Sequence, residues 1–126
     1  MDSQKKVLLI DDDTFITNIY SFELKKSGFS VFIAPNGLIG ITLAKNERPD
    51  IILLDIVMPD IDGLEVLRRL RLDPENKTIK ILLLTNLKDE VTINEGLSGG
   101  ADGYLIKTAL TPQQVAEEVI KEFSGS

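Results

Sequence analysis

The sequence predicts an α/β domain in which a doubly wound, five-stranded parallel sheet carries helices on both faces. Short apolar runs alternate five times with longer segments that have apolar residues at helical spacing, a pattern typical of parallel sheets with right-handed crossovers. The run 51–54 is apolar throughout, as expected for a strand buried on both faces. Five strands within 126 residues favour the flavodoxin-like strand order 2-1-3-4-5.

The expected elements begin and end at residues that commonly mark such boundaries. Asp13 or Thr14 can cap the first helix, Gly28 can end it in a left-handed conformation, and Pro112 starts the last helix. We expect strands over residues 7–10, 29–34, 51–54, 79–84 and 102–106, and helices over residues 15–26, 38–46, 64–72, 90–97 and 112–123. A loop is expected over residues 73–76.

Apolar residues at helical spacing indicate which side chains the helices bury. The Phe and Leu residues on the helices are expected in the core, together with Ile120 on the last helix. Ile16, Ile19 and Tyr20 on the first helix can serve either the core or a partner contact, and the sequence leaves both open. The adjacent charges at Lys5-Lys6 and Arg68-Arg69 are expected to be solvated.

Composition limits the chemistry available to this chain. The net charge of −6 disfavours non-specific binding to nucleic acid or to an anionic membrane. The sequence contains neither cysteine nor histidine, so thiol chemistry and zinc–thiolate sites are excluded. We expect one domain over residues 1–126, with its core at about residues 5–123 and no output domain. Because no signal peptide or membrane-spanning run is present, the expected location is the cytoplasm.

Polar residues follow four strands that are neighbours in the expected sheet. Asp11 and Asp12 follow the first strand, Asp55 the third, Thr85 the fourth and Lys107 the fifth. Because the carboxyl ends of parallel strands share one edge of the sheet, these side chains are expected to converge in one crevice. Carboxylates without histidine or sulfur suit Mg²⁺. An aspartate beside a metal, a hydroxyl and an ammonium can accept a phosphoryl group.

Several motifs extend, in order and at characteristic spacing, over nearly the whole chain. They are Asp11-Asp12 after an apolar strand, Leu54-Asp55 followed by Met58-Pro59-Asp60 and Asp62-Gly63, Leu84-Thr85, and the run from Gly100 to Lys107. On these motifs the chain resembles the receiver domains of bacterial two-component response regulators, of the single-domain type related to the chemotaxis regulator. The resemblance implies a phosphorylation-dependent signalling switch that catalyses its own phosphorylation and dephosphorylation and is not a metabolic enzyme.

The resemblance also implies how the crevice would work. Asp55 corresponds to the phosphoryl acceptor, which takes its group from a sensor histidine kinase, a phosphotransfer protein or a small phosphodonor. Asp11, Asp12 and Asp55, with the backbone carbonyl of Val57, correspond to the ligands of Mg²⁺, for which Mn²⁺ can substitute. Asp13, by contrast, is expected to cap a helix rather than to bind the metal.

Other residues correspond to the family's switch and output surface. Thr85 and Lys107 correspond to the groups that contact the new phosphoryl group, and Tyr104 to an aromatic residue that turns inward when the threonine moves. The implied output surface is the fourth helix, fifth strand and fifth helix, which would bind a downstream protein. A monomer and a phosphorylation-dependent dimer are both open, and direct contact with nucleic acid or membrane is not expected.

The sequence departs from the family's pattern in three places. Thr108 follows Lys107 where many members have proline after a cis peptide bond, so the geometry of this loop is open. Asn86 stands where a small residue is common and is expected to narrow access to the acceptor. Val57 and Leu87 occupy positions that influence self-dephosphorylation. Because neither can orient a water molecule by hydrogen bonding, we expect a long-lived phosphorylated form.

Two other classes of function compete with this interpretation. A Mg²⁺-dependent hydrolase of the haloacid dehalogenase type also uses a strand-end Asp, a Thr and a Lys. Such enzymes need a second acid where Val57 stands, and a cap for which 126 residues leave little room. A phosphorylation-independent binding module is the remaining alternative, which the intact set of crevice residues disfavours. Asp60 and Asp62 are expected to shape the loop rather than to touch the metal.

Overall fold

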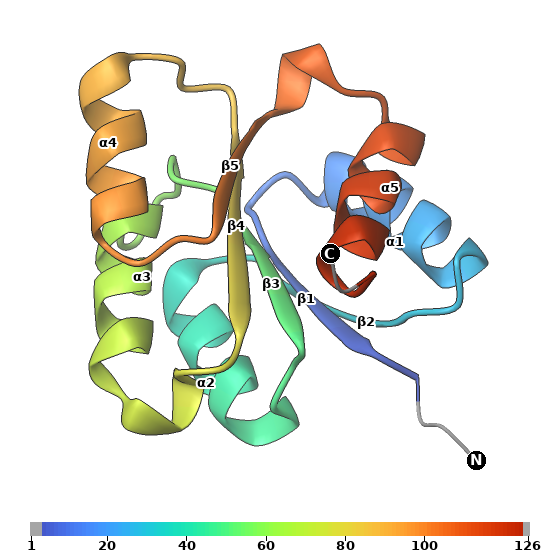
Figure 1. Ribbon diagram of the computed structural model, residues 1–126, viewed down its shortest axis with the longest axis horizontal. Coiled ribbons are helices and arrows are strands. Elements are labelled where there is room, and N and C mark those ends of the chain that lie inside the picture. Colours follow the sequence, from blue (N-terminus) through green and yellow to red (C-terminus); the bar gives the residue numbers. More distant parts are fainter. Residues whose placement is uncertain (1–3, 125–126) are drawn as a thin grey trace.

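The computed structural model describes residues 4–124, in which one parallel sheet is covered by helices on both faces (Figure 1). The strands are β1 (Lys6–Ile10), β2 (Ser30–Ala34), β3 (Ile51–Leu54), β4 (Lys80–Thr85) and β5 (Gly103–Ile106). They pair in the order β2-β1-β3-β4-β5, and every pair is parallel. The observed order confirms the predicted one, and it places the carboxyl ends of β1, β3, β4 and β5 next to one another.

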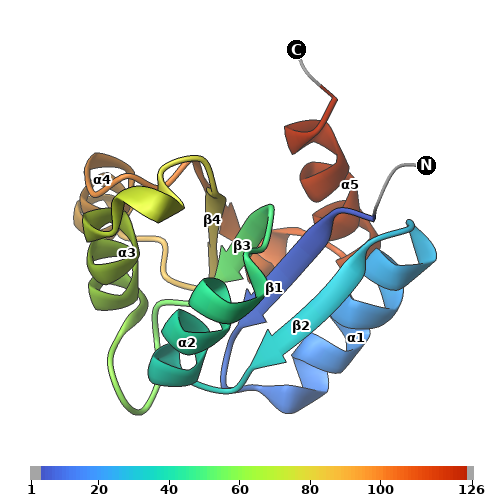
Figure 2. The ribbon, with the colours of Figure 1, turned by 90° about the horizontal axis from the view of Figure 1, so that it is seen from below.

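Among the described residues, four α-helices connect the strands and a fifth follows β5: α1 (Thr14–Lys26), α2 (Gly37–Glu47), α3 (Gly63–Leu72), α4 (Glu90–Ser98) and α5 (Pro112–Glu122). Helices α1 and α5 cover one face of the sheet, and α2, α3 and α4 cover the other (Figures 1 and 2). Every helix within residues 4–124 is too short or too polar to cross a lipid bilayer.

Two short 3₁₀ helices, Pro74–Asn76 and Lys107–Ala109, were not expected from the sequence. The first replaces the loop predicted over residues 73–76. Asp73 caps it by accepting a hydrogen bond of 3.0 Å from the N–H of Glu75, and Pro74 occupies its first position, where a missing N–H costs no hydrogen bond. The Lys107–Thr108 peptide bond, whose geometry the sequence left open, is trans.

The central strand β3 is anchored by side chains that enter both cores. Ile52 and Leu54 belong to the core under α2 and α3, whereas Ile51 and Leu53 belong to the core under α1 and α5. All four are at most 2% exposed. Burial of each contributes roughly 2 kcal/mol, so the strand holds the position of Asp55, the residue that follows it.

The helices bury fewer of their large apolar residues than the sequence predicts. Those that are exposed include Phe15 (75%), Phe22 (63%), Leu72 (68%) and Ile120 (42%). Their expected placement in the core is therefore wrong. On α1, the buried side toward the core consists instead of Thr17, Tyr20, Ser21 and Leu24. Helical spacing identifies an apolar stripe, but it does not show which side of the helix meets a neighbour.

Candidate functional site

Three carboxylates lie together at the carboxyl ends of two adjacent strands. Asp11 follows β1 and Asp55 follows β3, and these strands pair in parallel with Ile10 opposite Leu54. One oxygen each from Asp11, Asp12 and Asp55 lies within 4.8 Å of the others. Asp11 is 5% exposed and Asp55 is 7% exposed, while Asp12 is exposed. The structure thus brings together the three acidic residues that the sequence predicts.

Lys107 bridges the two buried carboxylates of this cluster. Its Nζ lies 2.6 Å from Oδ2 of Asp11 and 3.0 Å from Oδ2 of Asp55. The side chain follows β5, so it reaches across the end of β4 to meet β1 and β3. With three carboxylates and one ammonium, the cluster carries −3 + 1 = −2 when all four groups are charged. A divalent cation bound by hard oxygen ligands would balance that charge.

The ionisation of the site reflects burial and ion pairing in opposition. Burial raises the pKa of Asp11, although the hydrogen bonds from Lys107 and from the N–H of Asp13 oppose the rise. Burial by itself would lower the pKa of Lys107, but its hydrogen bonds to Asp11 and Asp55 outweigh that effect, so the pKa of Lys107 is raised. The ammonium therefore stays charged at neutral pH between the two carboxylates.

Backbone groups orient the same two carboxylates. Oδ1 of Asp55 accepts a hydrogen bond of 2.7 Å from the N–H of Ile56, and Oδ1 of Asp11 accepts one of 3.0 Å from the N–H of Asp13. In each residue one oxygen is held by the backbone while the other faces Lys107. Such fixed donors pre-organise the carboxylates, which reduces the entropy lost when they bind a cation or a reacting group.

The first turn of α3 packs directly against the backbone of Asp55. The N–H of Gly63 donates a hydrogen bond of 2.8 Å to the carbonyl of Ile56. A Cβ atom added at Gly63 would lie 2.1 Å from the carbonyl oxygen of Asp55. Only glycine fits this contact, so the Asp62-Gly63 motif has a structural reason that adds to its turn chemistry.

Thr85 and Tyr104 both contact the backbone of Leu87, in the loop between β4 and α4. Thr85 is buried at the end of β4, and its Oγ1 accepts a long hydrogen bond of 3.5 Å from the N–H of Leu87. The hydroxyl of the half-buried Tyr104 donates a bond of 3.0 Å to the carbonyl of Leu87. Burial raises the pKa of Tyr104, and the charges of Asp89 and Asp55 add to this, so the hydroxyl stays a donor.

Asn86 and Thr108, two departures from the family's pattern, contact each other. The N–H of Thr108 donates a hydrogen bond of 3.1 Å to Oδ1 of Asn86. A proline at position 108 would have no N–H to donate. The bond ties the loop after β4 to the loop after β5, next to Thr85 and Lys107. No sequence signal revealed this pairing, because the two residues are 22 positions apart.

The neighbouring aspartates take structural positions. Asp13 caps α1 by accepting from the N–H groups of Phe15 and Ile16, and Asp62 caps α3 by accepting from Glu65. Asp60 accepts hydrogen bonds from Gly37 and Leu38, so it ties the loop after Asp55 to the start of α2. The sequence did not indicate this link between Asp60 and α2. Val57, whose carbonyl is a predicted metal ligand, exposes 60% of its surface.

Comparisons with known proteins agree with this fold and identify the family. The family model described as "Response regulator receiver domain" matches residues 7–120. The chain therefore belongs to the response regulator receiver domain family of two-component systems. A solved structure of the chemotaxis protein CheY4 from Vibrio cholerae is similar, with a TM-score of 0.88 and 29% identity over 94% of this chain and 98% of that chain.

Curated relatives are longer than this chain. The transcriptional regulatory protein AfsQ1 of Streptomyces coelicolor is 40% identical over 101 residues, which cover 80% of this chain and 44% of the relative. CseB of the same organism is 36% identical over 107 residues, which cover 85% of this chain and 44% of the relative. The chain thus spans less than half the length of these two relatives.

Proposed function

We propose that this chain is a phosphorylation-dependent switch in which Asp55 accepts a phosphoryl group in a Mg²⁺-dependent reaction. The observation that carries the proposal is the bridging of Asp11 and Asp55 by Lys107, with distances of 2.6 and 3.0 Å, inside a cluster of three carboxylates. Phosphoryl transfer depends mainly on positioning and charge neutralisation, and this cluster supplies both. On this proposal the reaction is self-catalysed, and the chain is not a metabolic enzyme.

The donor set suits Mg²⁺, with Mn²⁺ as a substitute. Asp11, Asp12 and Asp55 would hold the ion together with the backbone carbonyl of Val57, and water would complete the shell. When bound, the ion neutralises charge on the transferred group. The carboxylates of Asp11 and Asp55 already lie within one cluster, and each has one oxygen held by a backbone N–H.

In the proposed step, a carboxylate oxygen of Asp55 attacks the phosphorus of a phosphohistidine. A new O–P bond forms as the P–N bond breaks, and the imidazole leaves with the electron pair. Lys107 gives up its ion pair with Asp55 and pairs with an oxygen of the new phosphoryl group. The hydroxyl of Thr85 donates a hydrogen bond to another oxygen. Both residues would therefore exchange present partners for the phosphoryl group.

We propose that movement of Thr85 reaches the surface through Leu87 and Tyr104. The loop carrying Leu87 contacts both side chains, so a shift of the threonine would alter the hydrogen bond of the tyrosine. The output surface would be α4, β5 and α5. A sensor histidine kinase or phosphotransfer protein would supply the phosphoryl group, and a downstream protein would read the surface, all in the cytoplasm.

The relatives AfsQ1 and CseB are transcriptional regulatory proteins. By analogy, the output reached by this receiver domain would be gene regulation, and the receiver itself would contact protein and not nucleic acid. Residues 1–126 would act as one receiver domain, either as a monomer or as a phosphorylation-dependent dimer. The aliphatic side chains of Val57 and Leu87 would leave an attacking water unoriented, which favours a long-lived phosphorylated form over one that lasts only seconds.

Beryllofluoride binding tests this proposal without a phosphodonor. With Mg²⁺ present, fluorine NMR should show a bound signal for the native protein and none for Asp55→Asn. The amide resonances of Thr85, Leu87 and Tyr104 should shift together on binding. A bound signal that survives in Asp55→Asn would contradict the assignment of the acceptor. Absence of binding to the native protein would favour the phosphorylation-independent binding module.

A further inference from the structure

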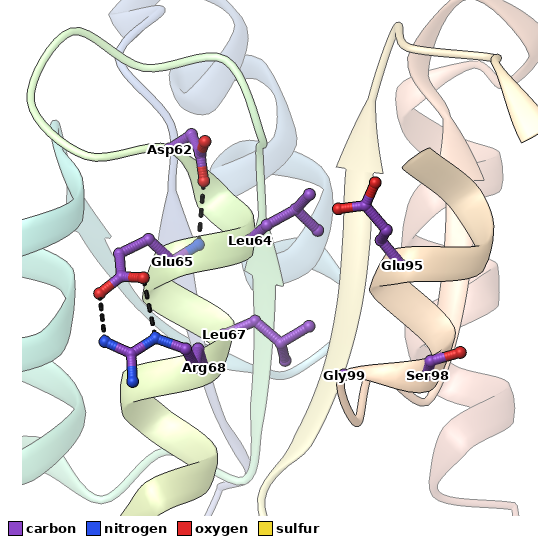
Figure 3. Close-up of a pocket in the computed structure, with 8 residues that line it drawn as sticks. All are labelled: Asp62, Leu64, Glu65, Leu67, Arg68, Glu95, Ser98 and Gly99. Carbon is purple, nitrogen blue, oxygen red and sulfur yellow. Dashed lines mark hydrogen bonds and ion pairs between the residues drawn. The ribbon is translucent and has the colours of Figure 1, made fainter. Parts of the chain in front are cut away.

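A groove of 610 Å³ lies between α3 and α4, away from the residues of the acidic cluster. Figure 3 shows Leu64 and Leu67 extending from α3 toward α4, with Glu95 and Ser98 on the opposite side. At the carboxyl end of α4, the groove is lined by Ser98, the last residue of the helix, and by Gly99, which caps it. The groove therefore has apolar side chains from one helix and a polar rim on the other.

The two rims differ in charge balance. On α3, Glu65 pairs with Arg68 at 2.6 Å and with Arg69 at 2.8 Å. Asp62 adds a second carboxylate to this rim, so its two acids and two arginines carry no net charge. On α4, Glu95 forms no ion pair with any other part of residues 4–124. The last turn of α4 contains no basic residue, although the carboxyl end of a helix favours cations. The α4 rim is thus an unbalanced negative edge beside an apolar surface.

Helix α4 forms an adaptable wall for this groove. Gly96 is its only buried residue in the described structure, and a Cβ atom added there would lie 2.4 Å from Cδ1 of Leu83. The helix therefore rests on β4 through a glycine. Val91 and Leu97 are 67% and 45% exposed. An element with so few buried side chains can shift at low cost.

We propose that the α3–α4 groove is a docking site for a cationic amphipathic helix of a partner protein. Aliphatic side chains of that helix would seat on Leu64 and Leu67, as in other helix-in-groove complexes. A Lys or Arg one turn away would face Glu95 and the carboxyl end of α4. Charge complementarity selects this occupant, because an acidic segment would be repelled by the same rim. The site shares α4 with the proposed output surface but adds α3, and it does not depend on the proposed phosphoryl transfer.

The test uses the unphosphorylated full chain, so its result is independent of the chemistry at Asp55. The probe is an acetylated, amidated peptide of about 15 residues, long enough to form a helix. It carries Leu at positions i and i+4 flanked by Lys, and a matched peptide carries Glu in place of Lys. In a ¹⁵N NMR titration, the Lys peptide should shift the amides of Leu64, Leu67, Glu95 and Gly99. The Glu peptide should bind at least about tenfold more weakly.

Three substitutions test whether the Lys peptide binds in the α3–α4 groove. Glu95→Lys should weaken binding of the Lys peptide about fivefold, and Ser98→Trp should abolish it by filling the groove. Glu117→Lys makes the same charge change on an exposed position of α5, across the sheet, and should leave binding unchanged. Dispersed amide spectra of each variant verify folding. Equal affinity of the two peptides, equal weakening by Glu95→Lys and Glu117→Lys, or shifts confined to another face would overturn the proposal.

Discussion

The backbone N–H of Thr108 donates a hydrogen bond of 3.1 Å to the side-chain oxygen of Asn86. These residues stand directly after Lys107 and Thr85, the two groups proposed to contact the phosphoryl group. The bond joins the loops in which those groups must exchange partners. Asn86 was expected from the resemblance to narrow access to the acceptor. Its amide oxygen accepts from Thr108, so Asn86 also braces the two loops. The narrowing of access stays a prediction.

Asn86→Ala removes the acceptor of this bond and should lower the free energy of unfolding by about 1 kcal/mol. Thr108→Ala keeps the backbone N–H, so it should cost much less. Urea unfolding of both variants, with and without Mg²⁺, measures the difference. A larger loss for Thr108→Ala than for Asn86→Ala would contradict a bracing role for this bond.

Lys107→Met removes the ammonium between Asp11 and Asp55. Without metal, the two buried carboxylates would repel each other, and the loss of stability should be about 3 kcal/mol. A divalent cation would take over the neutralising role, so Mg²⁺ should raise the melting temperature of the variant more than that of the native protein. Thermal unfolding with Mg²⁺ and after chelation measures this. An equal Mg²⁺ effect on both proteins would count against Mg²⁺ and Lys107 neutralising the same carboxylates.

Gly63→Ala places a methyl group 2.1 Å from the carbonyl oxygen of Asp55. The backbone of the acceptor must move, so we expect a loss of about 1–3 kcal/mol in stability together with weaker binding of Mg²⁺ in calorimetry. Gly28→Ala is the matched control. Its φ of +99° makes alanine strained, at about 1 kcal/mol, but no atom lies within 4 Å of the new methyl group. Unchanged Mg²⁺ affinity in Gly63→Ala would show that the contact between Gly63 and the Asp55 backbone does not affect the metal site.

The ion pairs of Glu65 lead us to expect an effect of pH on stability that arises outside the acidic cluster. Hydrogen bonds from Arg68 and then Arg69 lower the pKa of Glu65 from 4.5 to about 2. Because the folded-state pKa is depressed, the pair stabilises the fold above pH 4.5 and this contribution is lost as the pH falls toward 2. In Glu65→Gln, melting temperature should therefore fall less steeply across that range. Parallel pH profiles for the two proteins would show that the exposed pair contributes nothing measurable.

The convergence of the site could be predicted because it follows from topology. Once strands β1, β3, β4 and β5 are neighbours and parallel, Asp11, Asp55, Thr85 and Lys107 must lie at one edge. The contacts of Lys107 with both carboxylates also require its side chain to extend across the end of β4. Apolar runs and strand-end residues carry that information in the sequence itself, and it does not depend on which way any helix is rotated.

Other features depended on contacts between helices and loops, which no local pattern encodes. Phe15 and Phe22 share the spacing of buried residues, yet α1 turns Thr17 and Ser21 inward. The link from Thr85 through Leu87 to Tyr104 requires the path of a loop. For the same reason, the groove between α3 and α4 could not be predicted, since it depends on how far apart two separate helices pack.

The most direct test of Asp55 as a phosphoryl acceptor is the intact mass of the protein after incubation with Mg²⁺ and acetyl phosphate. The native protein should gain a single phosphoryl group. Asp55→Asn, and native protein with the metal chelated, should gain none. An adduct that persists in Asp55→Asn would contradict the assigned acceptor. If acetyl phosphate, a second small phosphodonor and beryllofluoride all fail to modify or bind the native protein, the chain is not a phosphorylated switch.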